Sequence, residues 1–135
     1  MTNFDPIDIA SSALTAERLR MDTISSNISN VNTTRDHNGN LNPYKRKLVV
    51  FKTILDQANA ERQGVTVEQI VDDQAPMRVV FEPGHPDADA QGYVAYPNVS
   101  VEKEMIDMIS AKAAYEASVT TIQTYKTMFN SALDI

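Results

Sequence analysis

The chain has 135 residues, with 42% hydrophobic and 22% charged side chains, and its net charge is −6. This length suits one modest domain or a small domain with long helical arms. The acidic balance argues against binding to nucleic acid, which requires a concentrated basic surface. Cys is absent, which excludes disulfides, thiolate catalysis and cysteine metal sites.

Neither membrane insertion nor a cleaved secretory signal is expected from the sequence. No stretch approaches the ~20 apolar residues of a membrane span. The opening segment, MTNFDPIDIASSALTAERL, has acidic residues where a signal peptide needs a cationic segment, and it lacks an unbroken apolar core. We therefore expect any export to use a route other than a cleaved signal.

The first predicted element is a helix that runs from about residue 6 to about residue 31. Asp5 suits its N-cap and Pro6 its first position, where the missing N–H group costs nothing. Two rows of mainly apolar residues with a spacing of seven follow, Ile7, Leu14, Met21 and Ile28 in one and Ala10, Glu17, Ile24 and Val31 in the other. So narrow a stripe is typical of a helix that pairs with another helix in a coiled-coil-like arm.

Three asparagines mark the predicted end of this helix, in the segment SNISNVNTT (26–34). Asn27, Asn30 and Asn32 are poor residues for a helix interior, because their side chains compete for backbone hydrogen bonds. We interpret them as the polar side of a helix end, able to bond freed carbonyl groups, to adopt a left-handed turn or to reach a neighbouring molecule.

The central segment is predicted to be rich in β-strands. β-Branched and aromatic runs with partial alternation cover residues 45–55, 64–71 and 77–82. Asn38-Gly39 is a strong turn signal. Residues 56–64 and 82–92 are expected to be loops, the second because it contains two prolines and two glycines.

The basic triplet Lys45-Arg46-Lys47, flanked by Tyr44 and Phe51, could suggest a nucleic-acid contact. Side chains alternate between the faces of a strand, and charges at a strand start commonly protect an edge from unwanted pairing. We favour the edge interpretation. Tyr93 and Tyr96 are interpreted as packing residues.

The last predicted element is a second helix, from about residue 100 to about residue 133. Glu102 and Glu104 favour its first turn. Its main row has a spacing of seven and consists of Val101, Met108, Tyr115, Ile122 and Phe129. A second row lies four positions further on and consists of Met105, Val119 and Leu133, with Lys112 and Lys126 at its two other positions. Such a helix spans roughly 50 Å at about 1.5 Å per residue, which is longer than a core of this size covers.

These elements predict an α+β fold in which long N- and C-terminal helices pair as a coiled-coil-like arm around a small β-rich insert. The expected divisions are residues 1–33, 34–98 and 99–135. One alternative is a self-contained hairpin in which the two helices bury each other. We favour an assembly role, because both stripes are long and narrow and the methionines at Met105, Met108 and Met128 suit an adaptable contact surface.

Candidate chemistry in the sequence is weak. Residues 87–92, DADAQG, begin like a calcium-binding loop, but position 12 is Asn98 where a bidentate Glu is needed, so a solvated turn with Asx-type hydrogen bonds is favoured. His37 and His85 have no second ligand at helical spacing, which argues against zinc. We assign no catalytic residue, cofactor or metal site.

A family resemblance rests on the stretch SSALTAERLRMDTISSNISNVNT (11–33). It resembles the N-terminal signature of the bacterial flagellar rod and hook family, in which a Ser-Ala-Leu start is followed by a helix that ends in Asn-x-x-Asn-x-Asn. The matching residues are Ser12, Ala13, Leu14, Asn27, Asn30 and Asn32. YKRKLVVF (44–51) and the long block 82–119 resemble the proximal-rod members of this family.

The resemblance implies a structural subunit of the flagellar proximal rod, the drive shaft that spans the periplasm. It implies polymerisation with copies of itself and with other rod proteins (FlgB, FlgF, FlgG and FliE), and export through the flagellar type III apparatus. The terminal helices are expected to form the inner layer, with the insert facing outward. The expected intersubunit residues are Leu14, Met21, Ile24, Ile28, Val31, Met105, Met108, Tyr115, Val119, Ile122, Phe129 and Leu133.

Two other functional classes remain open from the residues alone. The first is a soluble enzyme that uses His85 with Asp87 or Asp89, although no nucleophile or cofactor motif accompanies these residues. The second is a cytoplasmic coiled-coil adaptor that forms a discrete oligomer. The adaptor is distinguished by a closed oligomeric state, because a rod subunit polymerises without a fixed end.

Overall fold

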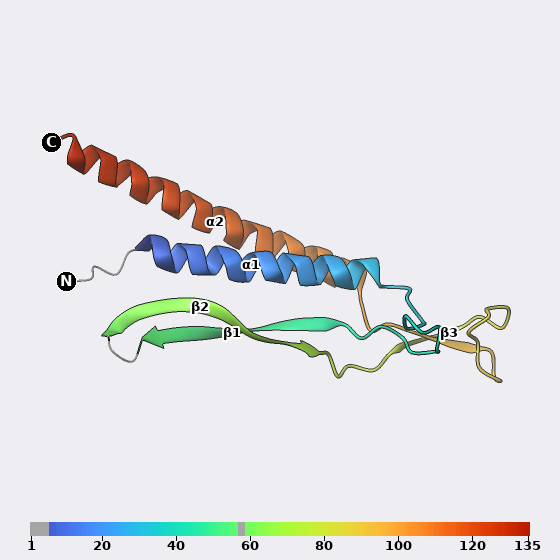
Figure 1. Ribbon diagram of the computed structural model, residues 1–135. Coiled ribbons are helices and arrows are strands. Elements are labelled where there is room, and N and C mark those ends of the chain that lie inside the picture. The colour runs from blue at the N-terminus through green and yellow to red at the C-terminus, as the bar shows by residue number, and fades with distance from the viewer. Residues whose placement is uncertain (1–5, 57–58) are drawn as a thin grey trace.

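The computed structural model describes residues 6–56 and 59–135, without the side chains of residues 55–63. The molecule is elongated, and two helices and a long β-ribbon run along most of its length (Figure 1). The elements in chain order are α1 (Pro6–Ser29), β1 (Lys47–Asp56), β2 (Asn59–Asp72), β3 (Arg78–Phe81), β4 (Tyr93–Tyr96) and α2 (Val101–Leu133). Neither described helix has the length and hydrophobicity that a membrane span requires. The predicted α+β architecture is confirmed.

The helices α1 and α2 pack side by side in opposite directions and diverge toward the C-terminal end of α2 (Figure 1). Small residues allow the close approach, because Ala16 is 3% exposed and Ala111 is fully buried. The observed α2 agrees with the predicted helix over about 100–133. The helix α1 ends at Ser29, and Val31 lies in the turn that follows, because the backbone N–H of Val31 bonds the Ile28 carbonyl at 3.3 Å instead of continuing the helical ladder.

The longest β-structure is the antiparallel ribbon of β1 and β2, which lies along α1 (Figure 1). The Ser12 hydroxyl of α1 accepts a hydrogen bond from the Val65 backbone N–H at 3.1 Å. Beside it, a Cβ placed on Gly64 would lie 3.3 Å from the Ser12 hydroxyl oxygen, so this glycine favours a close approach of ribbon and helix. The helix α1 therefore packs between α2 and the ribbon.

The predicted loop over residues 56–64 is wrong for its described part. β1 continues to Asp56 and β2 begins at Asn59, and the strands pair there through Leu55 opposite Gln63 and Asp56 opposite Asn59. Backbone hydrogen bonds sustain a two-stranded ladder whatever the polarity of the side chains. The polar composition of this segment therefore misled the prediction.

A second, smaller sheet consists of β3 and β4, at the end of the molecule far from the C-terminus of α2 (Figure 1). The sequence predicted β3, but it treated residues 93–96 only as packing residues and missed β4. A four-residue strand is too short to display a clear alternation. The predicted turn at Asn38-Gly39 is confirmed, with Gly39 at φ +81° and its N–H bonded to the Asp36 carbonyl at 3.0 Å.

Candidate functional site

The residues expected on the α1 seam are partly covered within the chain itself. Ile24 is 5% exposed, because α1 packs between α2 and the β-ribbon. The other four are half-buried: Leu14, Met21, Ile28 and Val31. The structure thus brings this set to the interior of the helix pair and leaves only part of its surface available to a neighbour.

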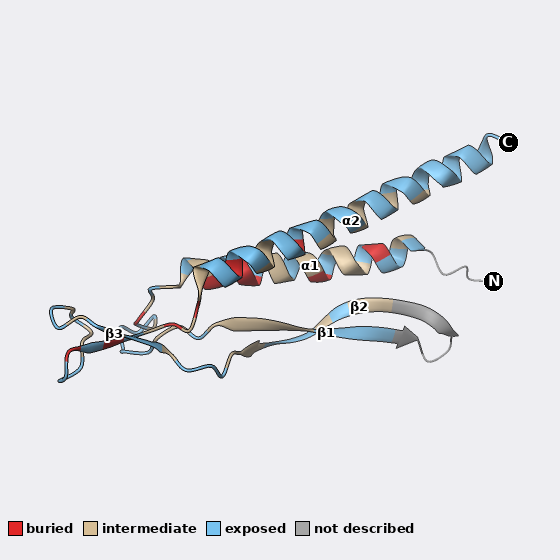
Figure 2. Ribbon diagram, turned by 180° about the vertical axis from the view of Figure 1, so that it is seen from behind, coloured by how far each residue is buried: buried red, intermediate tan, exposed pale blue. Residues whose placement is uncertain are grey.

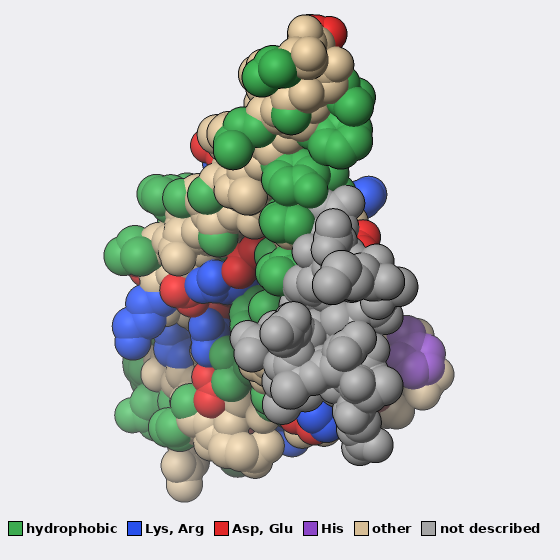
Figure 3. Space-filling view, turned by 90° about the vertical axis from the view of Figure 1, so that its left-hand side faces the viewer, with side chains coloured by type: hydrophobic (Ala, Val, Ile, Leu, Met, Phe, Trp, Pro, Cys, Tyr) green, Lys and Arg blue, Asp and Glu red, His purple; other side chains and the backbone are tan. Residues whose placement is uncertain are grey.

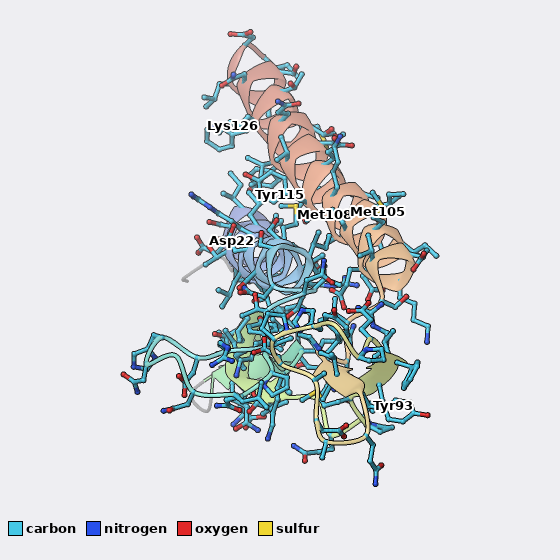
Figure 4. All side chains as sticks on the ribbon, turned by 90° about the vertical axis from the view of Figure 1, so that its right-hand side faces the viewer. Asp22, Tyr93, Met105, Met108, Tyr115 and Lys126 are labelled. Atoms are coloured by element: carbon cyan, nitrogen blue, oxygen red, sulfur yellow. The ribbon has the colours of Figure 1, made fainter. Side chains whose placement is uncertain are left out.

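The residues expected on the α2 seam divide into two groups. Met108 and Tyr115 lie on the side of α2 that faces α1, whereas Met105 lies on another side (Figure 4). Those that are half-buried are Met108, Tyr115, Val119 and Ile122, and those that are exposed are Met105, Phe129 and Leu133. The seven residues therefore do not form one surface in the isolated chain.

A larger apolar surface on α2 is exposed to solvent. We call these residues the α2 apolar surface; they form one group near the start of α2, Met105, Ile106 and Ile109, and a second near its end, Met128, Phe129 and Leu133, with exposures between 54% and 69%. Most residues of α2 are exposed to solvent, and all of its last residues are (Figure 2). The expected intersubunit residues did not include Ile106 and Ile109, because these residues lie off the rows with a spacing of seven, whereas Met128 was expected on a contact surface as one of the three methionines.

A groove opens where the two helices diverge. It has a volume of about 360 Å³ and is lined by Ile7 of α1 and by Tyr125, Lys126, Phe129 and Asn130 of α2. Figure 3 views this end of the molecule and shows hydrophobic side chains along α2. We call this feature the open-end groove. Its lining is mainly apolar, with one cation.

A buried polar cluster lies at the other end of the helix pair, and Asn27 of α1 is its centre. Asn27 is 1% exposed. Its side-chain Oδ1 accepts hydrogen bonds from the Lys47 backbone N–H and the Tyr44 hydroxyl, both at 2.9 Å. Its Nδ2 donates to the Lys47 carbonyl at 3.0 Å and to Glu104 Oε2 at 3.2 Å. One amide thus joins α1 to the start of β1 and to the first turn of α2.

The three signature asparagines therefore behave differently from one another. Asn30 bonds the last turn of the helix, because its Nδ2 donates at 2.8 Å to the Ser26 carbonyl, but this carbonyl is not free, since it also accepts from the Asn30 backbone N–H at 3.1 Å. Asn27 faces the interior instead of forming the polar side of the helix end. The proposed left-handed turn is wrong within the described residues, where only Gly39 and Gly92 have positive φ.

Arg46 completes the cluster from the insert. Its guanidinium pairs with the fully buried Glu104, with Asp73 at 3.1 Å and with Asp107 at 3.4 Å. Burial alone would lower the pKa of Arg46, but the hydrogen bonds and charges of Glu104 and Asp73 outweigh burial and raise it. The edge interpretation of the basic triplet therefore fails for Arg46, whose side chain anchors the insert to α2.

Asp73 in the same cluster has a lowered pKa, and the buried polar atoms of the cluster all have hydrogen-bond partners. A hydrogen bond from the Ala75 backbone N–H lowers the pKa of Asp73, Arg46 adds to this effect, and partial burial opposes it. Within the described part of the chain, every buried side-chain nitrogen or oxygen atom has a hydrogen-bond partner. A buried charge that is fully partnered specifies one geometry, whereas loss of a partner leaves an uncompensated charge.

The acidic loop 82–92 is an ordered turn region. The Asp89 side chain accepts hydrogen bonds from the backbone N–H groups of Gln91 and Tyr93, both at 2.9 Å, which confirms the predicted Asx-type turn. Asp87 accepts from the Thr34 hydroxyl at 2.5 Å and from Arg35 Nε at 2.7 Å. These bonds hold the pKa of the Asp87 carboxyl below its ordinary value.

Comparison with known proteins identifies the family. The family described as "Flagella basal body rod protein" matches residues 7–35, and the one described as "Flagellar basal body rod FlgEFG protein C-terminal" matches residues 90–135. A flagellar basal-body rod protein FlgC from Borreliella burgdorferi is 43% identical, with 98% of this chain and 96% of the relative covered. The chain belongs to the FlgC family of flagellar basal-body rod proteins.

Two further FlgC relatives extend the match to the whole chain. The protein from Bacillus subtilis is 41% identical and that from Yersinia enterocolitica 42%, each with 100% of this chain covered and with 99% and 98% of the relative covered, respectively. The segments matched by the two family descriptions contain α2 and all of α1 except Pro6, and they include Asn27 and Glu104. In this FlgC-family chain, Arg46 joins them from the insert between those segments.

Proposed function

We propose that this chain is a structural subunit of the proximal rod, which polymerises with copies of itself and other rod proteins into the drive shaft that transmits motor torque. The single observation that carries the proposal is the α2 apolar surface. Ile106 and Ile109 are 65% and 69% exposed, with Met105 beside them at 57%, and exposed large apolar side chains gathered in this way mark a protein contact site. Association with neighbours supplies the burial that the isolated chain lacks.

The family supports the assignment of layers. The paired helices, in the segments 1–33 and 99–135, form the inner layer of the rod, and the insert over residues 34–98 faces outward. The buried polar cluster suits this arrangement, because Arg46 of the insert forms an ion pair with the buried Glu104 of α2. Torque carried by the helices then reaches the insert through a stiff connection.

The seam residues have two roles in this proposal. The buried Ile24 and the half-buried Met108 and Tyr115 hold α1 and α2 together within one subunit. The exposed Met105, Phe129 and Leu133, with the rest of the α2 apolar surface, contact neighbouring subunits. The expected neighbours are further copies of this chain and the rod proteins FlgB, FlgF, FlgG and FliE.

For localisation and export, we propose what the family resemblance implies. The rod lies in the flagellar basal body and crosses the periplasm, and its subunits leave the cell interior through the flagellar type III apparatus without a cleaved signal. The chain acts in this setting through its contact surfaces and carries out no catalysis.

The decisive test introduces a charge into the α2 apolar surface. Ile109→Asp places a carboxylate where the side chain is 69% exposed in the isolated chain, so the subunit fold is retained while the contact with a neighbour is lost. In a strain that lacks the native gene, we expect export of the variant, no completed rods and no motility. Ser110→Asp, at the adjacent exposed position, is the matched control and should swim.

Motility of the two strains and light scattering of the purified chain distinguish the rod subunit from a coiled-coil adaptor. Motility of the Ile109→Asp strain equal to that of the Ser110→Asp strain contradicts the proposal. A purified native chain that forms one closed dimer at all concentrations in light scattering supports the coiled-coil adaptor instead.

A further inference from the structure

The exposed face of the small β3–β4 sheet is made of apolar side chains. The register pairs Val79 with Ala95 and Phe81 with Tyr93, so all four residues share one face. Val79 is 61% exposed and Phe81 is 60% exposed, whereas Val94, on the opposite face, is 1% exposed. A solvent-facing sheet surface ordinarily carries polar residues, so this composition points to a contact. We call it the β3–β4 face.

The aromatic part of this face is held in position. The Phe81 and Tyr93 rings meet edge to face with their centroids 5.1 Å apart. Gly92 has φ +86°, and a Cβ placed on it would lie 2.9 Å from the Phe81 ring and 3.2 Å from Pro83. The glycine thus allows the ring to pack against the backbone. An exposed aromatic side chain that is already ordered loses little conformational entropy when a partner covers it.

No other helix or strand of the described chain packs on the β3–β4 sheet. The face lies at one end of the elongated molecule, and the open-end groove, lined by Ile7 and by residues near the end of α2, lies toward the other end, near the termini (Figure 1). One molecule cannot bring the two surfaces together. A head-to-tail contact joins one surface of a molecule to a different surface of the next molecule, so it can continue from subunit to subunit. The β3–β4 face and the open-end groove meet this requirement, because they are different surfaces toward opposite ends.

The charges of the two surfaces are complementary. The loop 82–92, beside the β3–β4 face, contains Glu82, Asp87 and Asp89 and no Lys or Arg, and Arg35 from outside the loop pairs with Asp87 and not with Asp89. Between Glu116 and Asp134, the only charged residue of α2 is Lys126, which lines the groove. Lys126 and Asp89 form no ion pair with the described residues.

We propose that the β3–β4 face of one copy docks into the open-end groove of a second copy, with Phe81 and Tyr93 against the apolar lining and Asp89 near Lys126. This inference rests on the proposed rod function and adds a contact to it that uses Phe129 near the end of α2 and not Met105, Ile106 or Ile109 near its start. The groove volume of about 360 Å³ is within the range of sites that accept large apolar groups. The contact is small, so it forms within the assembled rod and not in dilute solution.

The absence of Cys makes disulfide cross-linking a direct test. Ala95→Cys lies on the face and Asn130→Cys on the groove, and both native residues are exposed. A disulfide requires Cα atoms within about 7 Å. In basal bodies isolated from a motile strain and treated with a mild oxidant, the double variant should give dimers, trimers and longer species. The control double variant Ala95→Cys with Ser110→Cys should remain monomeric.

Side-chain variants of the double-cysteine chain test the chemistry of the contact. Val79→Lys should lower the yield of multimers about tenfold, because it introduces a charge into an apolar contact, whereas the β-branched control Val79→Thr should lower it less than twofold. Asp89→Asn retains the Oδ1 acceptor of the turn and removes the charge. It should lower the yield about two- to fivefold at low salt, with no difference at high salt.

The outcomes distinguish this inference from the proposed function. Absence of the chain from isolated basal bodies overturns the proposed function. Its presence there, with no multimers from Ala95→Cys and Asn130→Cys, overturns the docking inference alone. A benzophenone amino acid at position 79 should cross-link to another copy of this chain. Cross-linking only to a different rod protein also overturns the inference.

Discussion

Replacement of the buried Glu104 tests whether the polar cluster is the joint between the helices and the insert. The side chain of Glu104 is fully buried, and its two oxygens accept from Arg46 and from Asn27. Glu104→Gln keeps the size of the side chain but presents one N–H₂ group in place of an acceptor. It therefore leaves either Arg46 or Asn27 without its bond.

The magnitude follows from the partners that remain. Loss of one partner of a buried ion pair costs about 3–5 kcal/mol. Arg46 still contacts Asp73 at 3.1 Å and Asp107 at 3.4 Å after the change, and a neutral hydrogen bond survives, so we place the loss lower, at about 2–3 kcal/mol. The matched control is Glu116→Gln. Its carboxylate is exposed and lies 3.9 Å from Lys112, so its loss should cost at most about 0.5 kcal/mol.

The assay is urea unfolding of the purified full-length chain, followed by far-ultraviolet circular dichroism. The free energy of unfolding at zero denaturant is compared among the native chain, Glu104→Gln and Glu116→Gln. Equal free energies for the two variants would refute the reasoning, because they would mean that Glu104 contributes no more than a surface carboxylate.

Three further predictions concern single side chains. The pKa of Asp87 is lowered in the folded state from an ordinary value of 3.8; its contribution to stability is therefore fully present above that value and lost as the pH falls through the lower folded pKa. An acid titration of the free energy of unfolding should be steeper for the native chain than for Asp87→Asn, and identical slopes would contradict this. Gly92→Ala should destabilise by about 1–2 kcal/mol in thermal unfolding, because φ is +86° and the Phe81 ring is 2.9 Å from the added carbon; Gly84→Ala, with nothing within 4 Å, should not. Tyr44→Phe removes the 2.9 Å bond to the cluster amide and should cost about 1 kcal/mol in urea unfolding; an unchanged value would show that this hydroxyl is replaced by solvent.

The helices were predictable because their signal is local and repeated. Apolar residues such as Leu14 and Met21 recur every seven positions, and the period of a helix is a property of neighbouring residues. The ends of the ribbon were less predictable. Strand pairing near Asp56 depends on the backbone of a partner strand, and polar side chains there gave no sign of it.

The polar cluster could not be predicted from the sequence. Asn27 and Glu104 are separated by 77 positions, and nothing local to either residue indicates that they meet. Arg46 lies in a triplet with two lysines, and only the fold shows that its side chain alone turns toward α2. Residue types limit which polar groups can pair, whereas the tertiary arrangement selects the pairs that form.

The exposed surface was only partly predictable for a related reason. A row with a spacing of seven identifies one side of a helix. The half-buried Met108 and Tyr115 belong to this row, and they lie on the side of α2 that faces α1 (Figure 4). Ile106 and Ile109 lie on a different side. The sequence could indicate that a second apolar side exists, but exposure became visible only when the position of α1 was known.

The most direct measurement of the central claim is thiol labelling at position 109. Ile109→Cys introduces the only thiol of the chain, at a side chain that is 69% exposed in the isolated subunit. We predict that a maleimide labels the purified monomer completely and labels the same variant at least about tenfold more slowly in basal bodies isolated from motile cells, because neighbouring subunits cover the α2 apolar surface there. Equal labelling rates in the monomer and in the assembled rod would contradict the account.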